Sequence, residues 1–157
     1  QALKGQIAGQ ALGKWAHDEQ TGEQARVHRP GIDITFSAPK SVSLLAEVCG
    51  QQEVREAHEA AVKKALSYIE NTLSYTRQTQ NGTTQRVRTG NLVIALFRHN
   101  TSRELDPQTH THAVVMNATH CKDGRWRSVM NDEIYCAQRL IGAIYMAELA
   151  DRLQGLG

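Results

Sequence analysis

Hydrophobic residues recur at helical spacing in two long stretches of the chain. From residue 52 to about residue 73, apolar side chains and one histidine recur every three or four residues at Val54, His58, Ala61, Val62, Ala65, Leu66, Ile69 and Leu73. The same spacing runs from about 131 to 153 through Ile134, Ala137, Leu140, Ile141, Ile144 and Leu149. Both stretches predict amphipathic helices, and His58 is expected to be a packing or boundary residue.

Shorter stretches predict a third helix and several strands. A helix is expected to start at residues 37–39 and to stop at Gly50, because proline is tolerated in a first turn. Residues 32–36 alternate apolar with polar side chains, and residues 91–99 and 111–119 form the two most apolar strands. Asn81-Gly82 predicts a hairpin between 74–78 and 84–88, and Asp123-Gly124 turns another, with Trp126 in the returning strand. The polar segment 100–108 is expected to be a loop. This order predicts an α+β fold, an antiparallel β-sheet with helices packed on one face.

Composition is typical of one compact domain. The 157 residues, 40% of them hydrophobic, can bury a core, so 1–157 are expected to form a single domain with 1–26 as a surface segment. No apolar run approaches the roughly 20 residues that cross a bilayer, so no membrane insertion is expected. Cys49, Cys121 and Cys136 lack metal-site spacing, which indicates reduced thiols in a cytoplasmic protein. The net charge of +2 neither indicates nor forbids a nucleic-acid partner.

Three histidines carry the candidate chemistry. His110 and His112 alternate along one predicted strand, so their side chains share a face, and His99 ends the preceding apolar strand. A neighbouring antiparallel strand can bring the third imidazole to the other two. Three convergent imidazoles would bind a metal ion and leave coordination positions open, which suits catalysis better than a structural role. The sequence therefore predicts a catalytic centre for one divalent metal ion.

Three longer motifs surround these histidines and resemble those of one family. They are HRPGIDITFSAPKSVS at 28–43, GNLVIALFRH at 90–99 and DPQTHTHAVVMN at 106–117. In order and spacing they are similar to the conjugative relaxases of the MobF class, the TraI and TrwC type of HUH endonuclease, over roughly 27–156. The resemblance implies an HUH relaxase palm with ferredoxin-like elements. It also implies that the chain is the central part of a relaxase (trans-esterase) domain.

The same resemblance implies an activity and its residues. Relaxases of this type are nickases of plasmid transfer, which cut and rejoin one strand of DNA at the origin of transfer through a tyrosyl–DNA intermediate. His99, His110 and His112 match the family's metal ligands, for magnesium, manganese, zinc or a similar ion. Asp33 matches the acidic residue that orients one ligand histidine. The implied partners are single-stranded plasmid DNA, relaxosome accessory proteins and a type IV secretion coupling protein, in the bacterial cytoplasm.

Two further expectations concern the DNA and the nucleophile. Lys40 and Arg103 are candidate phosphate-binding residues, with a solvated surface charge as the alternative for each. The family's nucleophilic tyrosine precedes the region that corresponds to Gln1, and this sequence has no tyrosine before Tyr68. No residue in the chain matches that nucleophile. All four tyrosines are expected to be core or boundary aromatics: Tyr68, Tyr75, Tyr135 and Tyr145.

Three functions stay open from the sequence. The first is a relaxase core that has its metal ligands but not its nucleophile, so that the chain alone is inactive. The second is a non-catalytic metal or single-stranded DNA binding module. The third is a metal-dependent hydrolase in which a bound water replaces the tyrosine. Oligonucleotide cleavage with and without the expected N-terminal segment supplied would separate the first from the second, and the third predicts no covalent protein–DNA adduct.

Overall fold

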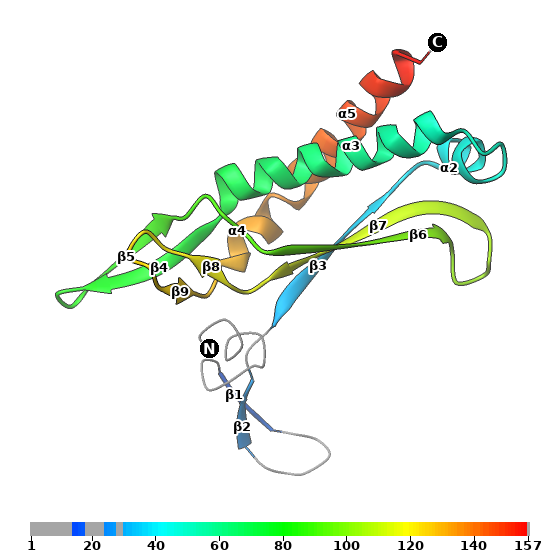
Figure 1. Ribbon diagram of the computed structural model, residues 1–157. Coiled ribbons are helices and arrows are strands. Elements are labelled where there is room, and N and C mark those ends of the chain that lie inside the picture. Colours follow the sequence, from blue (N-terminus) through cyan, green and yellow to red (C-terminus); the bar gives the residue numbers. More distant parts are fainter. Residues whose placement is uncertain (1–13, 18–23, 28–29, 157) are drawn as a thin grey trace.

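The computed structural model describes residues 14–17, 24–27 and 30–156 (Figure 1). The expected surface segment 1–26 lies largely outside these residues. The part of it that is described belongs to a short antiparallel pair, β1 (Lys14–His17) and β2 (Gln24–Val27), which the sequence did not predict.

The remaining elements confirm the predicted α+β class. After β3 (Gly31–Ser37) come the helices α2 (Lys40–Glu47) and α3 (Gln52–Tyr68), and α3 continues into the π-helical turn η1 (Ile69–Leu73). The hairpin β4 (Tyr75–Gln80) and β5 (Thr83–Arg88) precedes the long strands β6 (Ile94–Thr101) and β7 (Pro107–Met116). A second small hairpin, β8 (Thr119–His120) and β9 (Trp126–Arg127), leads to α4 (Asn131–Cys136) and α5 (Gln138–Gln154).

Several predicted boundaries were wrong. The strands expected over 91–99 and 111–119 are β6 and β7, which begin at Ile94 and Pro107 and end at Thr101 and Met116. The helix expected over 131–153 is divided at Ala137, whose ψ of 4° leaves the helical range. Spacing by three and four residues survives a break of one residue, so the hydrophobic pattern did not reveal it. The loop expected over 100–108 is shorter, because β6 runs on to Thr101 and β7 begins at Pro107.

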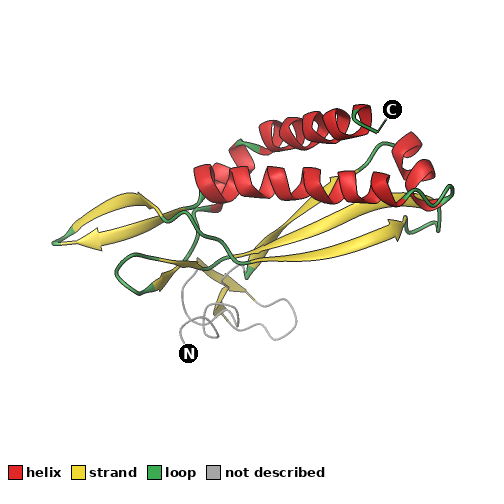
Figure 2. Ribbon diagram, turned by 45° about the horizontal axis from the view of Figure 1, so that its top comes forward, coloured by secondary structure: helices red, strands yellow, loops and turns green. Residues whose placement is uncertain are grey.

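The central sheet has the strand order β3-β7-β6, and both pairings are antiparallel. Helices α2, α3 and α5 lie on one side of it, and the β4–β5 hairpin projects from one end of the molecule (Figure 2). Alternate residues of β7 show the consequence of this layering. Thr109, Thr111, Ala113 and Val115 are buried, whereas the residues between them are half-buried on the opposite face. We call that opposite face, not covered by these helices, the open face.

The covered face packs the core. Ile32 and Phe36 of β3 and Ala113 and Val115 of β7 pack with buried residues of α3 and α5. Gly31 starts β3 where a side chain would not fit, because a Cβ there would stand 2.5 Å from the carbonyl oxygen of Val115. Within the described residues, no helix has the length and apolar character needed to span a membrane.

A polar cluster interrupts this apolar core. His58 of α3 is 3% exposed, with Nδ1 2.8 Å from the Tyr145 hydroxyl and Nε2 2.9 Å from Thr111 Oγ1. Burial, with a smaller contribution from the nearby Arg98 guanidinium, lowers the pKa of His58 from 6.5 to about 4. Burial also raises the pKa of the Tyr145 hydroxyl. Both groups are therefore neutral at physiological pH, because burial disfavours the charged form of each.

The depressed pKa of His58 predicts that the protein loses stability in weak acid. Between pH 6.5 and about 4 the unfolded chain binds a proton on His58 that the folded chain does not. The free energy of unfolding therefore falls as the pH is lowered through this window, by up to about 3 kcal/mol from this residue. Urea unfolding at a series of pH values should show a steeper acid-side loss for the wild type than for His58→Gln. Parallel curves for the two proteins would contradict the prediction.

Candidate metal centre

The strand register brings the three predicted histidines together on the open face. His99 of β6 pairs directly with His110 of β7, and His112 follows two residues later on the same face of β7. The ring centroids of His99, His110 and His112 form a triangle with sides of 5.1, 5.2 and 5.3 Å. The structure therefore assembles the three imidazoles that the sequence singled out.

Strand β3 brings Asp33 to the same cluster. Asp33, Thr35 and Ser37 alternate along β3 and share the open face, with Thr35 paired to His112 and Ser37 to His110. The Asp33 carboxylate oxygen lies 2.7 Å from His112 Nδ1, and Thr35 Oγ1 lies 3.2 Å from the same nitrogen. Sequence reasoning identified Asp33 but missed both hydroxyl residues, although the alternation of polar residues after Asp33 was a signal for them.

These contacts determine where two of the histidines carry their ring protons. A carboxylate or a carbonyl only accepts hydrogen bonds, so the nitrogen facing it must donate. His112 Nδ1 therefore donates to Asp33, and His110 Nδ1 donates to the carbonyl oxygen of Gln108 at 3.1 Å. In the neutral ring this leaves Nε2 of each residue with its lone pair free. Such a hydrogen bond from the second nitrogen is the usual support for a metal-ligating histidine.

The spacing of the rings fits a metal ion, although their nitrogens are not yet gathered on one point. Three imidazoles on a tetrahedral ion, with metal–nitrogen distances of about 2.0–2.1 Å, place their ring centroids roughly 5 Å apart. Among the described residues, however, no three His, Cys, Asp or Glu side chains converge as a ready ligand set. The backbone thus supplies the spacing, and rotation of the side chains would have to supply the convergence.

The histidines lie in an open depression of about 500 Å³ with one basic residue in its wall. The lining residues are Thr35, Ser37, His99, Thr101, Ser102, Arg103, Gln108, His110 and His112. His110 and His112 are half-buried, while His99 is exposed. The depression is therefore accessible to a large polar ligand, and Arg103 gives its wall a positive charge.

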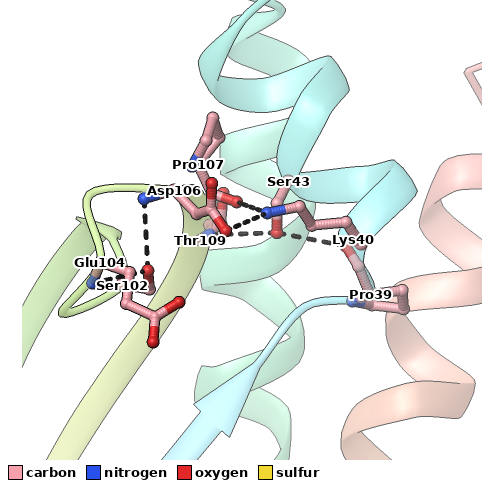
Figure 3. A network of polar contacts seen from close by, with 8 residues as sticks. All are labelled: Pro39, Lys40, Ser43, Ser102, Glu104, Asp106, Pro107 and Thr109. Carbon is pink, nitrogen blue, oxygen red and sulfur yellow. Dashed lines mark hydrogen bonds and ion pairs between the residues drawn. The ribbon is translucent and has the colours of Figure 1, made fainter.

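The structure places the two candidate phosphate-binding residues differently. Arg103 lines both the histidine depression and a neighbouring one of about 480 Å³, whereas Lys40 lines only the latter. There the Lys40 ammonium group lies 3.7 Å from an Asp106 carboxylate oxygen and donates to the Pro107 carbonyl oxygen at 3.2 Å (Figure 3). Lys40 is thus already engaged by the β6–β7 loop, and a phosphate would have to compete with Asp106 for it.

That loop is closed by hydrogen bonds between residues on either side of Arg103. Ser102 Oγ accepts hydrogen bonds from the backbone N–H groups of Glu104 and Asp106, both at 3.2 Å (Figure 3). Ser102 N–H also donates to the Asp106 carbonyl oxygen at 2.8 Å. Leu105 adopts a φ of 64°, a left-handed conformation that bulky residues rarely adopt, while its side chain is 81% exposed. The loop therefore keeps a strained backbone next to the histidines.

The tyrosines lie elsewhere. Tyr145 is buried on the covered face, against Phe36, and Tyr75 stacks under the Arg86 guanidinium at 3.7 Å. Tyr68 ends α3, and Tyr135 lies on α4, where it is 49% exposed. None of the four is among the residues that line the histidine depression.

Comparison with known proteins identifies the family. The family model described as TrwC relaxase matches residues 1–157. The multifunctional conjugation protein TraI of Escherichia coli is 45% identical over 139 residues, which is 83% of this chain and 8% of that protein. The TraI protein of Escherichia coli strain K12 is 42% identical over the same length and the same shares of the two chains.

Solved structures agree with the sequence matches. The metal-bound complex of the conjugative relaxase TrwC with oriT DNA is 46% identical and superposes with a TM-score of 0.82, covering 99% of this chain and 53% of that one. The copper-bound complex is 49% identical, with a TM-score of 0.84 and the same coverage. The chain thus spans about half of the solved relaxase chains and a small part of the curated relatives.

The geometry predicts unequal roles for His110 and Asp33 in metal binding. His110→Ala would remove a ligand, so affinity should fall much further than for Asp33→Asn. Asp33→Asn weakens only the support of His112, for which a loss of roughly 10- to 100-fold is expected. Calorimetric titration with zinc or manganese measures both variants, with exposed His120→Ala as the control that retains affinity. Equal binding by the wild type and a variant with all three histidines changed to alanine would exclude this site.

Proposed function

The chain belongs to the TrwC relaxase family, and on that premise we propose that it is the metal-binding core of a relaxase that cleaves and rejoins one strand of plasmid DNA at an origin of transfer. The observation that carries the proposal is the triangle of His99, His110 and His112 on the open face, with Asp33 bonded to His112. In this proposal residues 1–157 are the central part of the relaxase domain.

The chain's own residues prepare the site for a phosphodiester. A bound divalent ion would neutralise charge that builds up on the phosphate oxygens and would help to orient the group. Asp33 holds the ring proton of His112 on Nδ1, so that Nε2 stays available as a donor atom. Arg103, in the wall of the same depression, would attract the DNA backbone.

The ion is proposed to be divalent, and its identity follows from general affinities. Three imidazoles bind zinc, copper or nickel more tightly than magnesium. Affinity alone does not decide which ion a protein holds in the cell, so we propose that the site takes whichever of zinc, manganese, magnesium or a similar ion is available. The solved TrwC complexes include one described as metal-bound and one as copper-bound. Because the ligand histidines must be neutral, ion binding is expected to compete with protons.

Single-stranded DNA is the proposed substrate, lying across the open face. TrwC has been solved with a 27-mer DNA that comprises a recognition hairpin and the cleavage site. On this chain Phe97 pairs with His112 in the strand register and is 53% exposed, which offers an aromatic surface for base stacking beside the metal centre. From family membership we also propose that the protein acts in the bacterial cytoplasm. Its further partners would be relaxosome accessory proteins and a type IV secretion coupling protein.

The nucleophile is proposed to be a tyrosine hydroxyl from outside residues 1–157. Its oxygen would bond to phosphorus while the bond to the 3′-oxygen breaks, leaving a 5′-phosphotyrosine link and a free 3′-hydroxyl. An attacking atom must approach to about 3–3.5 Å in line with the leaving group. Tyr145 is buried on the covered face, and the other three tyrosines are not in the histidine depression, which supports an outside nucleophile.

Single-stranded DNA binding should depend on Arg103 more than on Lys40. Arg103→Ala should reduce affinity and reduce the salt dependence by a slope of about 0.7, the value for one phosphate contact on a single strand. Lys40→Ala should have the smaller effect, because Asp106 already neutralises that charge. Fluorescence anisotropy at several salt concentrations measures both variants. Arg152→Ala is the control, because it removes one positive charge from α5 on the covered side and should leave DNA affinity unchanged. A loss of affinity in Arg152→Ala equal to that in Arg103→Ala would show that the DNA does not lie across the open face.

Cleavage of a labelled strand that carries the cognate origin tests the function itself. With manganese present, the 157-residue chain alone should give no covalent adduct on a denaturing gel. The full-length protein should give one, and His110→Ala in that protein should abolish it. An adduct on the chain alone that one tyrosine-to-phenylalanine change removes would refute the outside nucleophile. Cleavage without any adduct would indicate the hydrolase, and binding without cleavage by the full-length protein would indicate a non-catalytic module.

A further inference from the structure

The buried polar cluster lies directly behind the metal centre. Thr111 separates His110 from His112 along β7 and projects to the covered face, where it is 3% exposed. It pairs with Phe36 of β3 and Arg98 of β6, so its row across the sheet lies between the row of His110 and the row of His112. Any movement of Thr111 therefore moves the backbone that carries both imidazoles.

Three elements meet at this residue. His58 of α3 reaches Thr111 Oγ1 with Nε2 and the Tyr145 hydroxyl of α5 with Nδ1, at 2.9 and 2.8 Å. All three side chains are 3% exposed. The arrangement that gives the phenol proton an acceptor has Tyr145 donating to Nδ1, which places the His58 proton on Nε2, donating to Thr111. The cluster thus connects two helices to one point of β7 by directional bonds.

The covered face of β7 is polar toward its N-terminal end and apolar toward its C-terminal end. The next inward residues of β7 are Ala113 and Val115, both fully buried and apolar. Apolar side chains would pack the Thr111 row as well, without the desolvation that a buried imidazole, phenol and hydroxyl require. The buried residues of β7 that are polar are Thr109, bonded to Ser43 and Glu47, and Thr111. The Thr111 row is the one that lies between the rows of His110 and His112. On the other side of the sheet, hydrogen bonds from Asp33 and the Gln108 carbonyl orient the two rings, whereas the helices that can hold the β7 backbone lie behind it.

We infer that His58 and Tyr145 are positioning residues for the metal centre, acting through Thr111. Their hydrogen bonds hold the Thr111 side chain and thereby restrain the β7 backbone at this residue. The same backbone sets the directions in which the side chains of His110 and His112 project. Directional bonds to a central strand restrict it more narrowly than apolar contacts, which permit sliding. The inference rests on the proposed metal site and adds the support behind it.

Conservative variants of the full chain test this inference. Thr111→Val and Tyr145→Phe each remove one hydroxyl with little change in volume, and zinc affinity is measured by calorimetry where circular dichroism shows the variant fully folded. We expect each to lower zinc affinity about tenfold, the low end of effects seen for groups that support ligands. Each should also shift the visible absorption of the cobalt-substituted protein. His58→Gln, whose amide can replace Nε2–H toward Thr111, should retain more affinity than His58→Leu.

A matched control separates positioning from general stability. Val115→Ala truncates a buried residue on the same strand and face, away from the cluster, and should destabilise the fold while leaving zinc affinity and the cobalt spectrum unchanged. Wild-type affinity in both Thr111→Val and Tyr145→Phe would overturn the inference, as would an equal loss in Val115→Ala. If Thr111→Val does not fold, Tyr145→Phe decides. A wild type that binds neither zinc nor cobalt would exclude the metal site and the inference together, whereas normal binding by the wild type and by both hydroxyl variants excludes the inference alone.

Discussion

The two-residue period of β7 is the constraint on which the rest of the structure depends. β7 is the central strand of its sheet, and one of its faces is covered by helices. Its register with β3 and β6 therefore decides at once which residues enter the core and which reach the open face. A slip of one residue would bury His110 and His112 under α3 and would expose Ala113 and Val115. The hydrophobic core and the histidine triangle are consequently specified by the same pairing, and neither can shift without the other.

Most of the elements in this arrangement could be predicted from the sequence, because period and turn chemistry are local signals. The alternation in 32–36, the helical spacing after residue 52 and the Asn81-Gly82 turn all predicted the elements that the structure contains. The shared face of His110 and His112 followed from their spacing alone. The contact of Asp33 with His112 lies across a strand pair, and it was anticipated through the resemblance to relaxases rather than from any local pattern.

Contacts between distant parts of the chain could not be predicted. Lys40 and Arg103 were both candidate phosphate-binding residues, but the β6–β7 loop places Asp106 against Lys40, while Arg103 also lines the histidine depression. His58 was interpreted correctly as a packing residue, yet its partners Thr111 and Tyr145 lie 53 and 87 positions away. No periodicity in one sequence can identify such partners. The break at Ala137 was missed for the opposite reason, since it changes direction without changing the hydrophobic spacing.

The two faces of the sheet thus make complementary demands on β7. A metal-ligand set needs a backbone held to a fraction of an ångström, but its rings must still turn to gather their nitrogens on an ion. The covered face meets the first demand, with apolar packing at Ala113 and Val115 and directional hydrogen bonds at Thr109 and Thr111. The open face meets the second, because His99 is exposed and the other two rings are only half-buried. Placing the rigid contacts behind the strand and the adjustable side chains in front of it allows one strand to satisfy both requirements.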